Sequence, residues 1–496
     1  MAESANRLHS KNNDLNKFAF AAGRGTSPMR NRQVQGKANH TACAARTTVT
    51  RAQLIVFSGS TAGVVASLFL SPYIAPLILI AIQLGFLSVA GWRLMTLLTR
   101  LPSSPQHPAP AIWPRYTIIA ALYDEAAVLP QLVERLGRID YPEDRLEGFL
   151  ALEADDSVTI AAALATERPD WLKVLIVPPG SPNTKPRALN FALSVASGDL
   201  VTIYDAEDDP DPLQLREAAA RFAVEENDLV CLQAPLRIQR RDKRKSASPF
   251  LDVQFAAEYA ALFEVTLPAM AALGLPFPLG GTSNHFRASA LRTLGGWDAW
   301  NVTEDADLGF RIWRSGGRMG MLERPTYETP PGALRLWLPQ RTRWLKGHLQ
   351  TLAVHTRSLG GMGWRGWSAL GLTLGAGCAS AAIHAASFAW IGVVALASIV
   401  SGQLPPAPPL GMSVLIAGVA TAWLAKLTGA RRAGVRYGLR EMAASPAYWC
   451  LLSLAFVHAA FRLVTEPHRW DKTPHSPDVA PIEDINDAVG AGRAAA

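Results

Sequence analysis

Three groups of side chains in this sequence have the residue types and the order needed for a group-transfer reaction. An acidic cluster at Asp205-Ala206-Glu207-Asp208-Asp209 is followed by Thr303-Glu304-Asp305 and then by Gln340-Arg341-Thr342-Arg343-Trp344. Clustered carboxylates can hold a divalent cation against a sugar diphosphate. A separate aspartate can take the proton of an acceptor hydroxyl, and an arginine beside a tryptophan can bind phosphate and stack on a sugar ring.

The acidic cluster is the strongest of these signals. Five of the seven residues from Asp205 to Asp211 are acidic, and such side chains repel one another unless something neutralises them. Oxygen ligands at a strand end suit Mg²⁺ or Mn²⁺, which bridges diphosphate oxygens. A solvated acidic loop is the simpler interpretation of the same residues.

Carboxylates at two earlier strand ends are candidates for nucleotide binding. Asp124 lies between a predicted strand and a helix, where anions are favoured, although it can equally cap that helix. A carboxylate at the end of the second strand can accept the imide N–H of uracil. We favour Glu153 for this contact, with Asp155 as the alternative, whereas Asp156 and Ser157 suit a helix N-cap.

Two further segments carry polar groups that suit a donor site. Lys185 opens a predicted helix and can meet phosphate or close over the base; the alternative is a surface lysine, since lysine is commonly exposed. The segment Gly280–Arg287 combines a permissive backbone with polar side chains, or forms a plain turn.

Asp305 is our candidate for the general base. A base at an inverting centre must lie within hydrogen-bond reach of the acceptor hydroxyl. Its neighbours Glu304 and Asp307 can instead be charges in the first turn of a helix, where they complement the helix dipole.

The segment Leu334–Thr351 mixes Trp, Leu and Arg ahead of a hydrophobic run and predicts an interfacial amphipathic helix. Within it, the guanidinium of Arg343 can clamp a leaving diphosphate, and Trp344 can form a platform for the acceptor sugar. Membrane anchoring alone is the alternative, because Trp and Arg at an interface need no further role.

Strands and helices alternate from Arg115 to about Val230. This alternation predicts a doubly wound, largely parallel α/β sheet. Ligands bind such sheets at the carboxyl ends of the strands, where the candidate residues fall. The candidate strands are Tyr116–Leu122, Gly148–Glu153, Leu172–Val177, Leu200–Tyr204 and Leu229–Gln233.

Hydrophobic segments flank this part of the chain. Residues 52–92 contain no Asp, Glu, Lys or Arg and have room for two membrane spans, with a turn at Ser71-Pro72. After Arg365 the next such charge is Lys426, which predicts spans near 368–392 and 409–427, or two short ones within 367–404. A further span is expected over 445–461.

Composition supports a membrane protein: 49% of residues are hydrophobic, 18% are charged, and the net charge is +7. The positive charge gathers before Ala52, with nine Lys or Arg against two acids, which fits the positive-inside bias or a disordered tail better than nucleic-acid binding. Four scattered cysteines indicate neither a disulfide framework nor a zinc site. No secretory signal peptide is evident.

The motifs resemble those of processive, membrane-embedded family-2 glycosyltransferases with a GT-A domain, relatives of cellulose, chitin, hyaluronan and poly-N-acetylglucosamine synthases. The resemblance covers roughly residues 115–355 and the flanking spans, and Pro467–His475 resembles the ending of a bacterial exopolysaccharide subgroup. It implies UDP binding by Asp124, Glu153 and Lys185. It further implies that Asp205, with Glu207 or Asp208, binds the sugar diphosphate and the metal, and that Asp305 is the general base. The residues implied to bind the diphosphate or the acceptor are Thr303, Glu304, Gln340, Arg343 and Trp344.

The expected protein is an inverting, UDP-sugar-dependent exopolysaccharide synthase of a bacterial inner membrane, with Mg²⁺ or Mn²⁺ as cofactor and a cytoplasmic catalytic domain. Its expected partners are the donor, the growing polysaccharide, the bilayer and accessory secretion proteins. The alternatives are transfer of one sugar to a lipid carrier and a non-catalytic nucleotide-binding membrane protein or transporter. The expected regions are a disordered tail (1–51), two spans (52–98), the GT-A domain (115–330), interfacial helices (331–364), C-terminal spans (365–463) and a tail (464–496).

Overall fold

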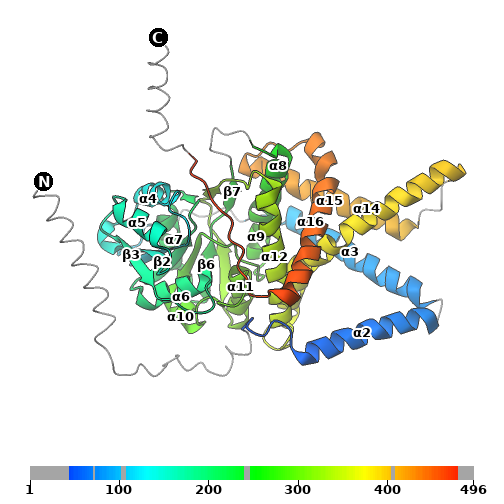
Figure 1. Ribbon diagram of the computed structural model, residues 1–496, viewed down its shortest axis with the longest axis horizontal. Coiled ribbons are helices and arrows are strands. Elements are labelled where there is room, and N and C mark those ends of the chain that lie inside the picture. Colours follow the sequence, from blue (N-terminus) through cyan, green and yellow to red (C-terminus); the bar gives the residue numbers. More distant parts are fainter. Residues whose placement is uncertain (1–43, 71–72, 102–107, 240–245, 404–407, 479–496) are drawn as a thin grey trace, which may run out of the picture. The chain divides into compact units, whose positions relative to one another are not determined.

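The computed structural model describes residues 44–70, 73–101, 108–239, 246–403 and 408–478. Its centre is a seven-stranded sheet with the strand order β3-β2-β1-β4-β8-β6-β9 (Figure 1). Within this sheet only β8 runs antiparallel to its neighbours. The predicted doubly wound, mostly parallel α/β sheet is therefore confirmed. The strands are β1 (Tyr116–Leu122), β2 (Leu146–Glu153), β3 (Leu172–Val177), β4 (Leu200–Tyr204), β6 (Leu229–Gln233), β8 (Asn284–Arg287) and β9 (Arg318–Met321).

All five predicted strands are present, and β2 begins two residues before its predicted start at Gly148. Their apolar runs are buried, as expected for a parallel sheet covered on both faces. The segment Gly280–Arg287 does not end in a plain turn, because Asn284–Arg287 form β8 and pair with both β4 and β6. A smaller sheet combines β5 (Asp209–Pro210), β10 (Thr326–Glu328) and β7 (Leu236–Ile238).

Helices cover both faces of the large sheet. Adjacent residues of β1 point to opposite faces: Ile118 joins a core with Leu132 and Leu215, whereas Ile119 joins a core with Leu189. The helices of this part are α4 (Leu129–Gly137), η2 (Glu143–Arg145), α5 (Ser157–Ala165), α6 (Lys185–Val195), α7 (Gln214–Val224), α8 (Pro249–Ala261), η3 (Leu262–Thr266), α9 (Leu267–Ala272), α10 (Ala288–Thr293) and α11 (Glu304–Arg314).

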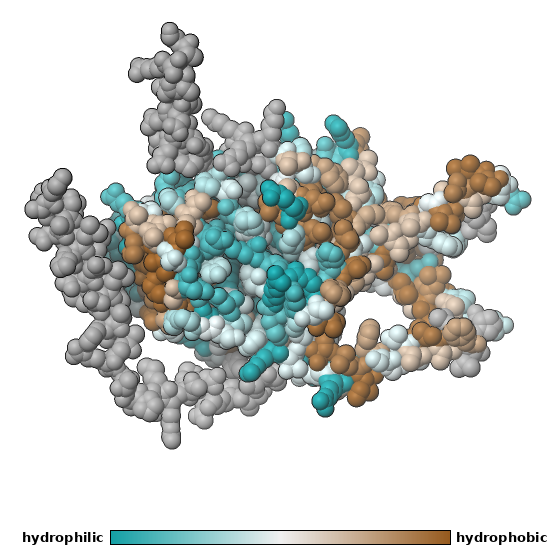
Figure 2. Space-filling view, in the orientation of Figure 1, coloured by the Kyte–Doolittle hydropathy of each residue, from teal (hydrophilic) through white to brown (hydrophobic). Residues whose placement is uncertain are grey.

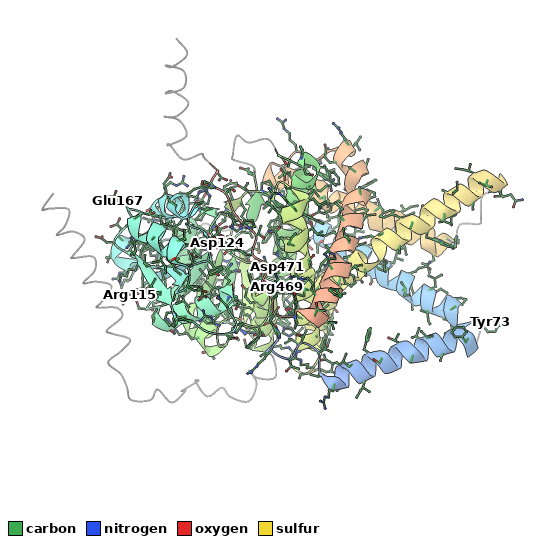
Figure 3. The ribbon with its side chains drawn as sticks, viewed as in Figure 1. Tyr73, Arg115, Asp124, Glu167, Arg469 and Asp471 are labelled. Atoms are coloured by element: carbon green, nitrogen blue, oxygen red, sulfur yellow. The ribbon has the colours of Figure 1, made fainter. Side chains whose placement is uncertain are left out.

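Long apolar helices flank the sheet domain. They are α2 (Arg51–Leu70), α3 (Ile74–Leu98), α13 (Gly363–Leu370), η4 (Gly371–Gly375), α14 (Ala376–Ser401), α15 (Pro409–Ala433) and α16 (Leu439–Thr465). Four described helical runs, 74–98, 363–401, 409–433 and 439–465, have the length and composition to cross a membrane. Figure 2 shows hydrophobic surface over the outer parts of these helices, and Tyr73 lies between α2 and α3 (Figure 3).

The run from 363 to 401 is one continuous helix that includes η4, so the alternative of two short spans is not realised. The predicted turn at Ser71-Pro72, Cys43, and tail residues 1–43 and 479–496 lie outside the described residues. Residues just before α2 are not disordered as predicted: Ala45 is buried, and its N–H donates to Asp298 over 2.5 Å. That contact orders the segment because it satisfies a carboxylate which is itself buried.

The predicted interfacial helix is α12 (Leu334–His355), which packs against α16. Beyond α16, residues 466–478 follow the catalytic domain back toward the ends of β1 and β4. Figure 3 labels Arg469 and Asp471 at the start of this segment. We call residues 466–478 the C-terminal strap.

Candidate active site

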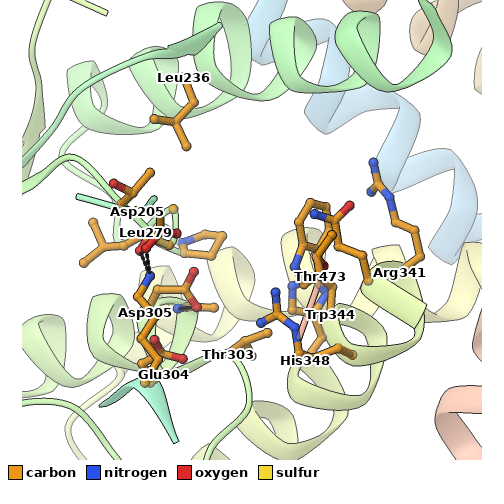
Figure 4. A pocket seen from close by; sticks show the side chains of 18 of the residues that line it. Asp205, Leu236, Leu279, Thr303, Glu304, Asp305, Arg341, Trp344, His348 and Thr473 are labelled. Carbon is orange, nitrogen blue, oxygen red and sulfur yellow. Dashed lines mark hydrogen bonds and ion pairs between the residues drawn. The ribbon is translucent and has the colours of Figure 1, made fainter. Parts of the chain in front are cut away.

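A pocket of about 610 Å³ opens at the carboxyl ends of β1, β2 and β4. Figure 4 shows Asp205, Glu304 and Asp305 on one side of it and Arg341, Trp344 and His348 on the other. Sequence-predicted residues thus meet from elements far apart in the chain. Those lining the pocket are Glu153, Lys185, Asp205, Glu207, Thr303, Glu304, Asp305, Gln340, Arg343 and Trp344.

Asp124 is a predicted nucleotide ligand that the structure does not bring into this pocket. Its φ of 52° turns the chain at the end of β1, and its side chain is 85% exposed. Aspartate tolerates this left-handed conformation better than most residues. The neighbours Tyr123 and Glu125 line the pocket instead, and the Glu125 side chain is only 5% exposed.

At the end of β2 the structure separates the two candidate carboxylates. Glu153 lines the pocket and is paired with Arg187, whereas Asp155 is not among the lining residues. Burial raises the pKa of Glu153 above its ordinary value, although Arg187 opposes the shift. Asp156 is the N-cap of α5, where its Oδ1 accepts from the Thr159 N–H over 3.1 Å. The geometry thus favours Glu153 over Asp155 for contact with a base.

Lys185 is held inside the pocket by two partners. Its ammonium forms an ion pair with Asp205 and donates to the carbonyl of Gly281 over 2.8 Å. Burial lowers the pKa of Lys185, but the charges of Asp205 and Glu304 more than offset this and raise it above its ordinary value. This lysine therefore stays cationic beside the acidic cluster, and is not a surface residue.

The side chains of Glu207 and Asp208, the two candidate partners of Asp205 in metal binding, point in different directions. Asp208 is fully buried and accepts hydrogen bonds from the Thr282 hydroxyl and from the Asp205 N–H, the latter over 2.7 Å. Glu207 lines the pocket, and its Oε1 lies 3.1 Å from Nε2 of His475. Burial alone would raise the pKa of Glu207, but His475 outweighs burial and lowers it to about 2. Glu207 is thus an ionised oxygen donor facing the pocket.

These carboxylates have the chemistry of a divalent-cation site. Buried Oε2 atoms of both Glu125 and Glu207 have no hydrogen-bond partner among the described residues. Such unpaired carboxylate oxygens fit a hard cation. However, no described group of three or more His, Cys, Asp or Glu side chains has the arrangement of a formed metal centre. The predicted metal therefore remains a proposal.

Asp305 and Glu304 begin α11 beside Lys185. Asp305 accepts from the Ala306 N–H over 2.8 Å, and burial raises its pKa. Burial, with the charge of Asp305 second, raises the pKa of Glu304 to about 8. Asp307 points away and lies 3.1 Å from Nε2 of His355 in the interior. One face of this helix therefore presents two carboxyl groups to the pocket, of which Glu304 holds its proton more tightly than an ordinary glutamate.

The two arginines of α12 have different surroundings. Arg341 pairs with Glu258 over 2.8 Å and covers one face of Trp344, with 4.5 Å between the guanidinium and the ring centroid. Arg343 donates to the Val302 carbonyl over 3.2 Å and stacks on Trp470 at 4.6 Å. Both arginines keep a buried Nε without a hydrogen-bond partner among the described residues, but the charge of Arg341 is already paired with Glu258. Arg343 is therefore better placed than Arg341 to receive an anionic leaving group.

Gly347 sets the distance between α12 and the Thr303-Glu304-Asp305 segment. A Cβ at this position would overlap the Thr303 side chain more closely than real Cβ atoms approach their neighbours. We predict that Gly347→Ala lowers kcat by about tenfold or more, because a small displacement of a catalytic group has effects of this size. Steady-state kinetics will test this, with Gly360→Ala as control because its Cβ meets only Ser358, at 3.9 Å. Wild-type kcat in Gly347→Ala would contradict it.

Several residues of the pocket lie outside the motifs to which the sequence assigns a role. They come from the membrane-side helices and from the strap: Val89, Trp92, Tyr259, Phe263, His348, Leu372, Thr473 and His475 are examples. Pro467–His475 stands out in the sequence for its density of His, Trp and charged residues. Its place beside the acidic cluster depends on the path of α16, which local patterns do not encode.

Part of the chain matches a family of known proteins. Residues 200–427 match the family described as glycosyl transferase family group 2. This part of the chain is similar to family-2 glycosyltransferases. The match supports the predicted enzyme class, and the fold is GT-A-like: a mixed, mostly parallel sheet with helices, followed by long apolar helices.

Two curated relatives illustrate the range of the similarity. A beta-monoglucosyldiacylglycerol synthase from Synechocystis sp. is 28% identical over 57% of this chain and 58% of its own length. The cellulose synthase 1 catalytic subunit from Komagataeibacter xylinus is 25% identical over 52% of this chain and 33% of its own length. The chain thus spans little more than half the length of the first relatives it matches.

Among solved structures, a mannosyltransferase from Pyrobaculum calidifontis in complex with GDP-Man and Mn²⁺ aligns with 78% of this chain and 99% of its own. The sequence identity is 19% and the TM-score is 0.45.

Proposed function

We propose that this chain transfers a hexosyl group from a nucleotide-diphosphate sugar to a hydroxyl group of a membrane lipid. The observation that supports this most is the course of the pocket. It begins at Asp205 and Glu207 and continues past Asp305 to α3 and η4. A polar donor end and an apolar acceptor end therefore share one cavity.

The apolar end lies between helices that have membrane-spanning character. Trp92 of α3 lines it, as do Leu372 and Leu374 of η4 and Phe263 of η3. A lipid whose headgroup reaches Asp305 would keep its acyl chains among such side chains, where apolar surface is removed from water. A soluble acceptor would gain little from this lining.

The outer parts of the same helices favour a lipid acceptor over a long polymer. Leu77 of α3 is 63% exposed and Val400 of α14 is 80% exposed, so these side chains face outward. A polysaccharide crossing the bilayer needs a continuous wall that satisfies its hydroxyl groups. The exposed side chains of Leu77 and Val400 offer no hydrogen-bonding group to such a chain.

The residues of the polar end suggest the roles in transfer. Asp305 would accept the proton of the attacking hydroxyl, and Arg343 and Lys185 would offset the charge that develops on the leaving diphosphate. Asp205 and Glu207 would hold Mg²⁺ or Mn²⁺, which when bound neutralises diphosphate oxygens. Glu153 would receive the base of the nucleotide, with uracil as the proposed base.

The relatives are consistent with this choice. Three curated beta-monoglucosyldiacylglycerol synthases are 27–28% identical to the chain, whereas the cellulose synthase subunits are 25–26% identical over a smaller share of their own length. The polysaccharide synthase expected from the resemblance, with its accessory secretion proteins, thus receives less support than its alternative of lipid glycosylation.

The path of α16 supports a catalytic domain and a C-terminal strap on the same side of the membrane. Near its start, the Glu441 carbonyl accepts from the Gln254 side chain over 2.6 Å. Just past its end, the Glu466 carbonyl accepts from Lys346 over 3.0 Å. Because both partners belong to the catalytic side, we infer that α16 lies along the interface and does not span. We propose that α3, α14 and α15, together with α2, span a bacterial inner membrane, and that their basic ends and this domain lie on the cytoplasmic side.

The product formed by purified protein in lipid vesicles tests the proposed function. With radiolabelled UDP-glucose, Mn²⁺ and diacylglycerol, we expect a glycolipid carrying one sugar that moves with lipids on thin-layer chromatography. Long, water-soluble or gel-retained chains would instead identify a polysaccharide synthase. Omission of diacylglycerol is the control, and unchanged product in its absence would contradict this acceptor.

A pair of substitutions on α14 tests the acceptor end directly. Gly377 lines the pocket and has open space around its Cβ position, so Gly377→Trp would fill the apolar end. We expect lipid transfer to fall at least about tenfold, the effect of a few buried CH₂ groups, while UDP binding is retained. Gly392→Trp is the matched control, because Gly392 lies on the same helix in open space. Equal activity of the two variants would contradict an acceptor between α3 and η4.

A further inference from the structure

The C-terminal strap forms one wall of the pocket. Trp470, Lys472, Thr473 and His475 all line the cavity, although they lie more than 250 residues beyond Asp205 in the sequence. The strap therefore does not hang free after α16. It places two basic side chains next to the carboxylates at the ends of β1 and β4.

His475 lies between two carboxylates from different strand ends. Its Nδ1 is 2.8 Å from Oε1 of Glu125, and its Nε2 is 3.1 Å from Oε1 of Glu207. Lys472 adds a second contact to Glu125 over 3.1 Å and donates to the Asp124 carbonyl over 2.5 Å. Lys472 and His475 therefore bring basic groups next to the carboxylates of Glu125 and Glu207.

The strap is fastened on both sides of His475. At its root, the fully buried Lys346 donates to the carbonyls of Glu466 and Arg469, over 3.0 and 2.9 Å. At its far end, Asp478 pairs with Arg135, and its N–H donates to Gln131 over 2.8 Å. Because the strap is anchored before and after His475, its imidazole loses little further conformational entropy when it contacts the carboxylates.

We propose that the strap closes the donor site in the absence of metal, with His475 occupying the carboxylate Glu207 in place of the divalent cation. Binding of the cation with its nucleotide then requires His475 to leave Glu207 and the strap around it to shift. The inference rests on the proposed role of Glu207 in metal binding, but not on the identity of the acceptor.

Geometry makes the two occupants exclusive. Both imidazole nitrogens lie at hydrogen-bond distance from the carboxylates. A cation bound to Glu207 through the same Oε1 would stand at about 2.0–2.6 Å from that oxygen, in the volume filled by the imidazole. The second oxygen of each carboxylate, Oε2, is buried and has no hydrogen-bond partner among the described residues. Exchange of His475 for a cation would satisfy oxygens that the strap leaves unpaired.

The test measures Mn²⁺ affinity of the full chain in lipid nanodiscs, without nucleotide, by the paramagnetic resonance signal of free Mn²⁺. We expect His475→Ala to bind Mn²⁺ about tenfold more tightly than wild type, since contacts to charged groups change an equilibrium by this order. His468→Ala is the matched control: its imidazole lies on the same strap but contacts the Trp300 carbonyl, at 3.0 Å. The control is expected to match wild type.

The other outcomes overturn the proposal. Weaker binding by His475→Ala would show that His475 is a ligand of the metal, and equal binding would show that it does not compete. No binding by either protein would remove the cation from the argument. Lipid transfer by the wild-type protein, measured separately, decides the proposed function whatever the result here.

Tryptic cleavage after Lys472 gives a second measure that needs no turnover. Its side chain is 26% exposed in the closed strap. We expect Mn²⁺ with UDP to accelerate cleavage at this bond several-fold in wild type, followed by mass spectrometry. His475→Ala is expected to be cleaved quickly even without Mn²⁺. A wild-type strap that becomes better protected when Mn²⁺ and UDP bind would show closure over the ligand and would overturn the proposed release.

Discussion

Asp305→Asn is expected to lower the rate of sugar transfer by about 10²–10⁴-fold, the usual contribution of a general base. The asparagine keeps the size of the side chain and can still occupy the start of α11, but it cannot accept the proton of the acceptor hydroxyl. Binding of UDP should change little, because Lys185, Glu153 and Arg343 remain in place. Single-turnover transfer and UDP titration on the same preparation measure the two effects. Wild-type turnover in this variant would show that Asp305 is not the base.

Glu304→Gln is the matched comparison at the neighbouring position. The pKa of Glu304 is raised to about 8, first by burial and then by the charge of Asp305, so near neutral pH this carboxyl group is largely protonated. A glutamine imitates that neutral form. We therefore expect this variant to keep most of its activity at pH 7, which contrasts with the loss in Asp305→Asn.

The pH dependence of transfer follows from the same shifts. Asp305 acts only when ionised, and burial raises its pKa. Activity should accordingly rise with pH, with an acid limb above the ordinary range of an aspartate. Glu304 is largely protonated over this range, so Glu304→Gln should leave the acid limb where it lies in the wild-type protein. A limb that moves to lower pH in Glu304→Gln would show that Glu304 is ionised where Asp305 titrates, and would contradict the protonated state of Glu304.

Asp205→Ala is expected to reduce transfer by at least about a hundredfold and to abolish metal-dependent binding of the nucleotide sugar. Loss of a metal ligand removes charge stabilisation worth several kcal/mol, and Lys185 loses its ion-pair partner at the same time. Calorimetric titration with UDP, with and without Mn²⁺, measures binding separately from turnover. The wild-type protein should lose activity in EDTA and regain it with Mg²⁺ or Mn²⁺.

Asp211→Ala is the control for the acidic cluster. Asp211 pairs with Arg324 over 3.0 Å, and it is not among the residues that line the pocket. Removing this charge changes the net charge of the cluster by the same amount as Asp205→Ala. If both variants lose activity to the same extent, the cluster acts through its overall charge. In the separate EDTA experiment, full activity of the wild-type protein would exclude a catalytic cation.

The sequence alone determined those features that local patterns encode. Apolar runs bounded by turn residues located the strands β1, β2, β3, β4 and β6, because a buried parallel strand needs an unbroken apolar stretch. The long stretches with few charged residues located the helices around residues 52–98 and 363–433, because uncharged runs of this length are typical of membrane-spanning helices. Residue type and order also indicated Lys185, Asp205 and Asp305, and all three line the pocket.

Tertiary structure decided which of several adjacent carboxylates faces the pocket. Glu207 faces it and Asp208 does not, because Thr282, 74 residues later, takes the Asp208 oxygen into the interior. Likewise Glu125 replaces Asp124 there, because the chain turns through a positive φ at Asp124. Neighbouring acidic residues look alike in a sequence, and only contacts with distant segments distinguish them.

The strap is the clearest case of information that is absent from local pattern. His475 meets Glu125 across 350 residues, and this contact exists because the strap runs from the end of α16 back to the catalytic domain. Hydrophobicity predicts that α16 is apolar, but it does not say whether such a helix crosses the bilayer or lies along it. The polar partners at its two ends, Gln254 and Lys346, come from distant parts of the chain, and only the fold brings them there.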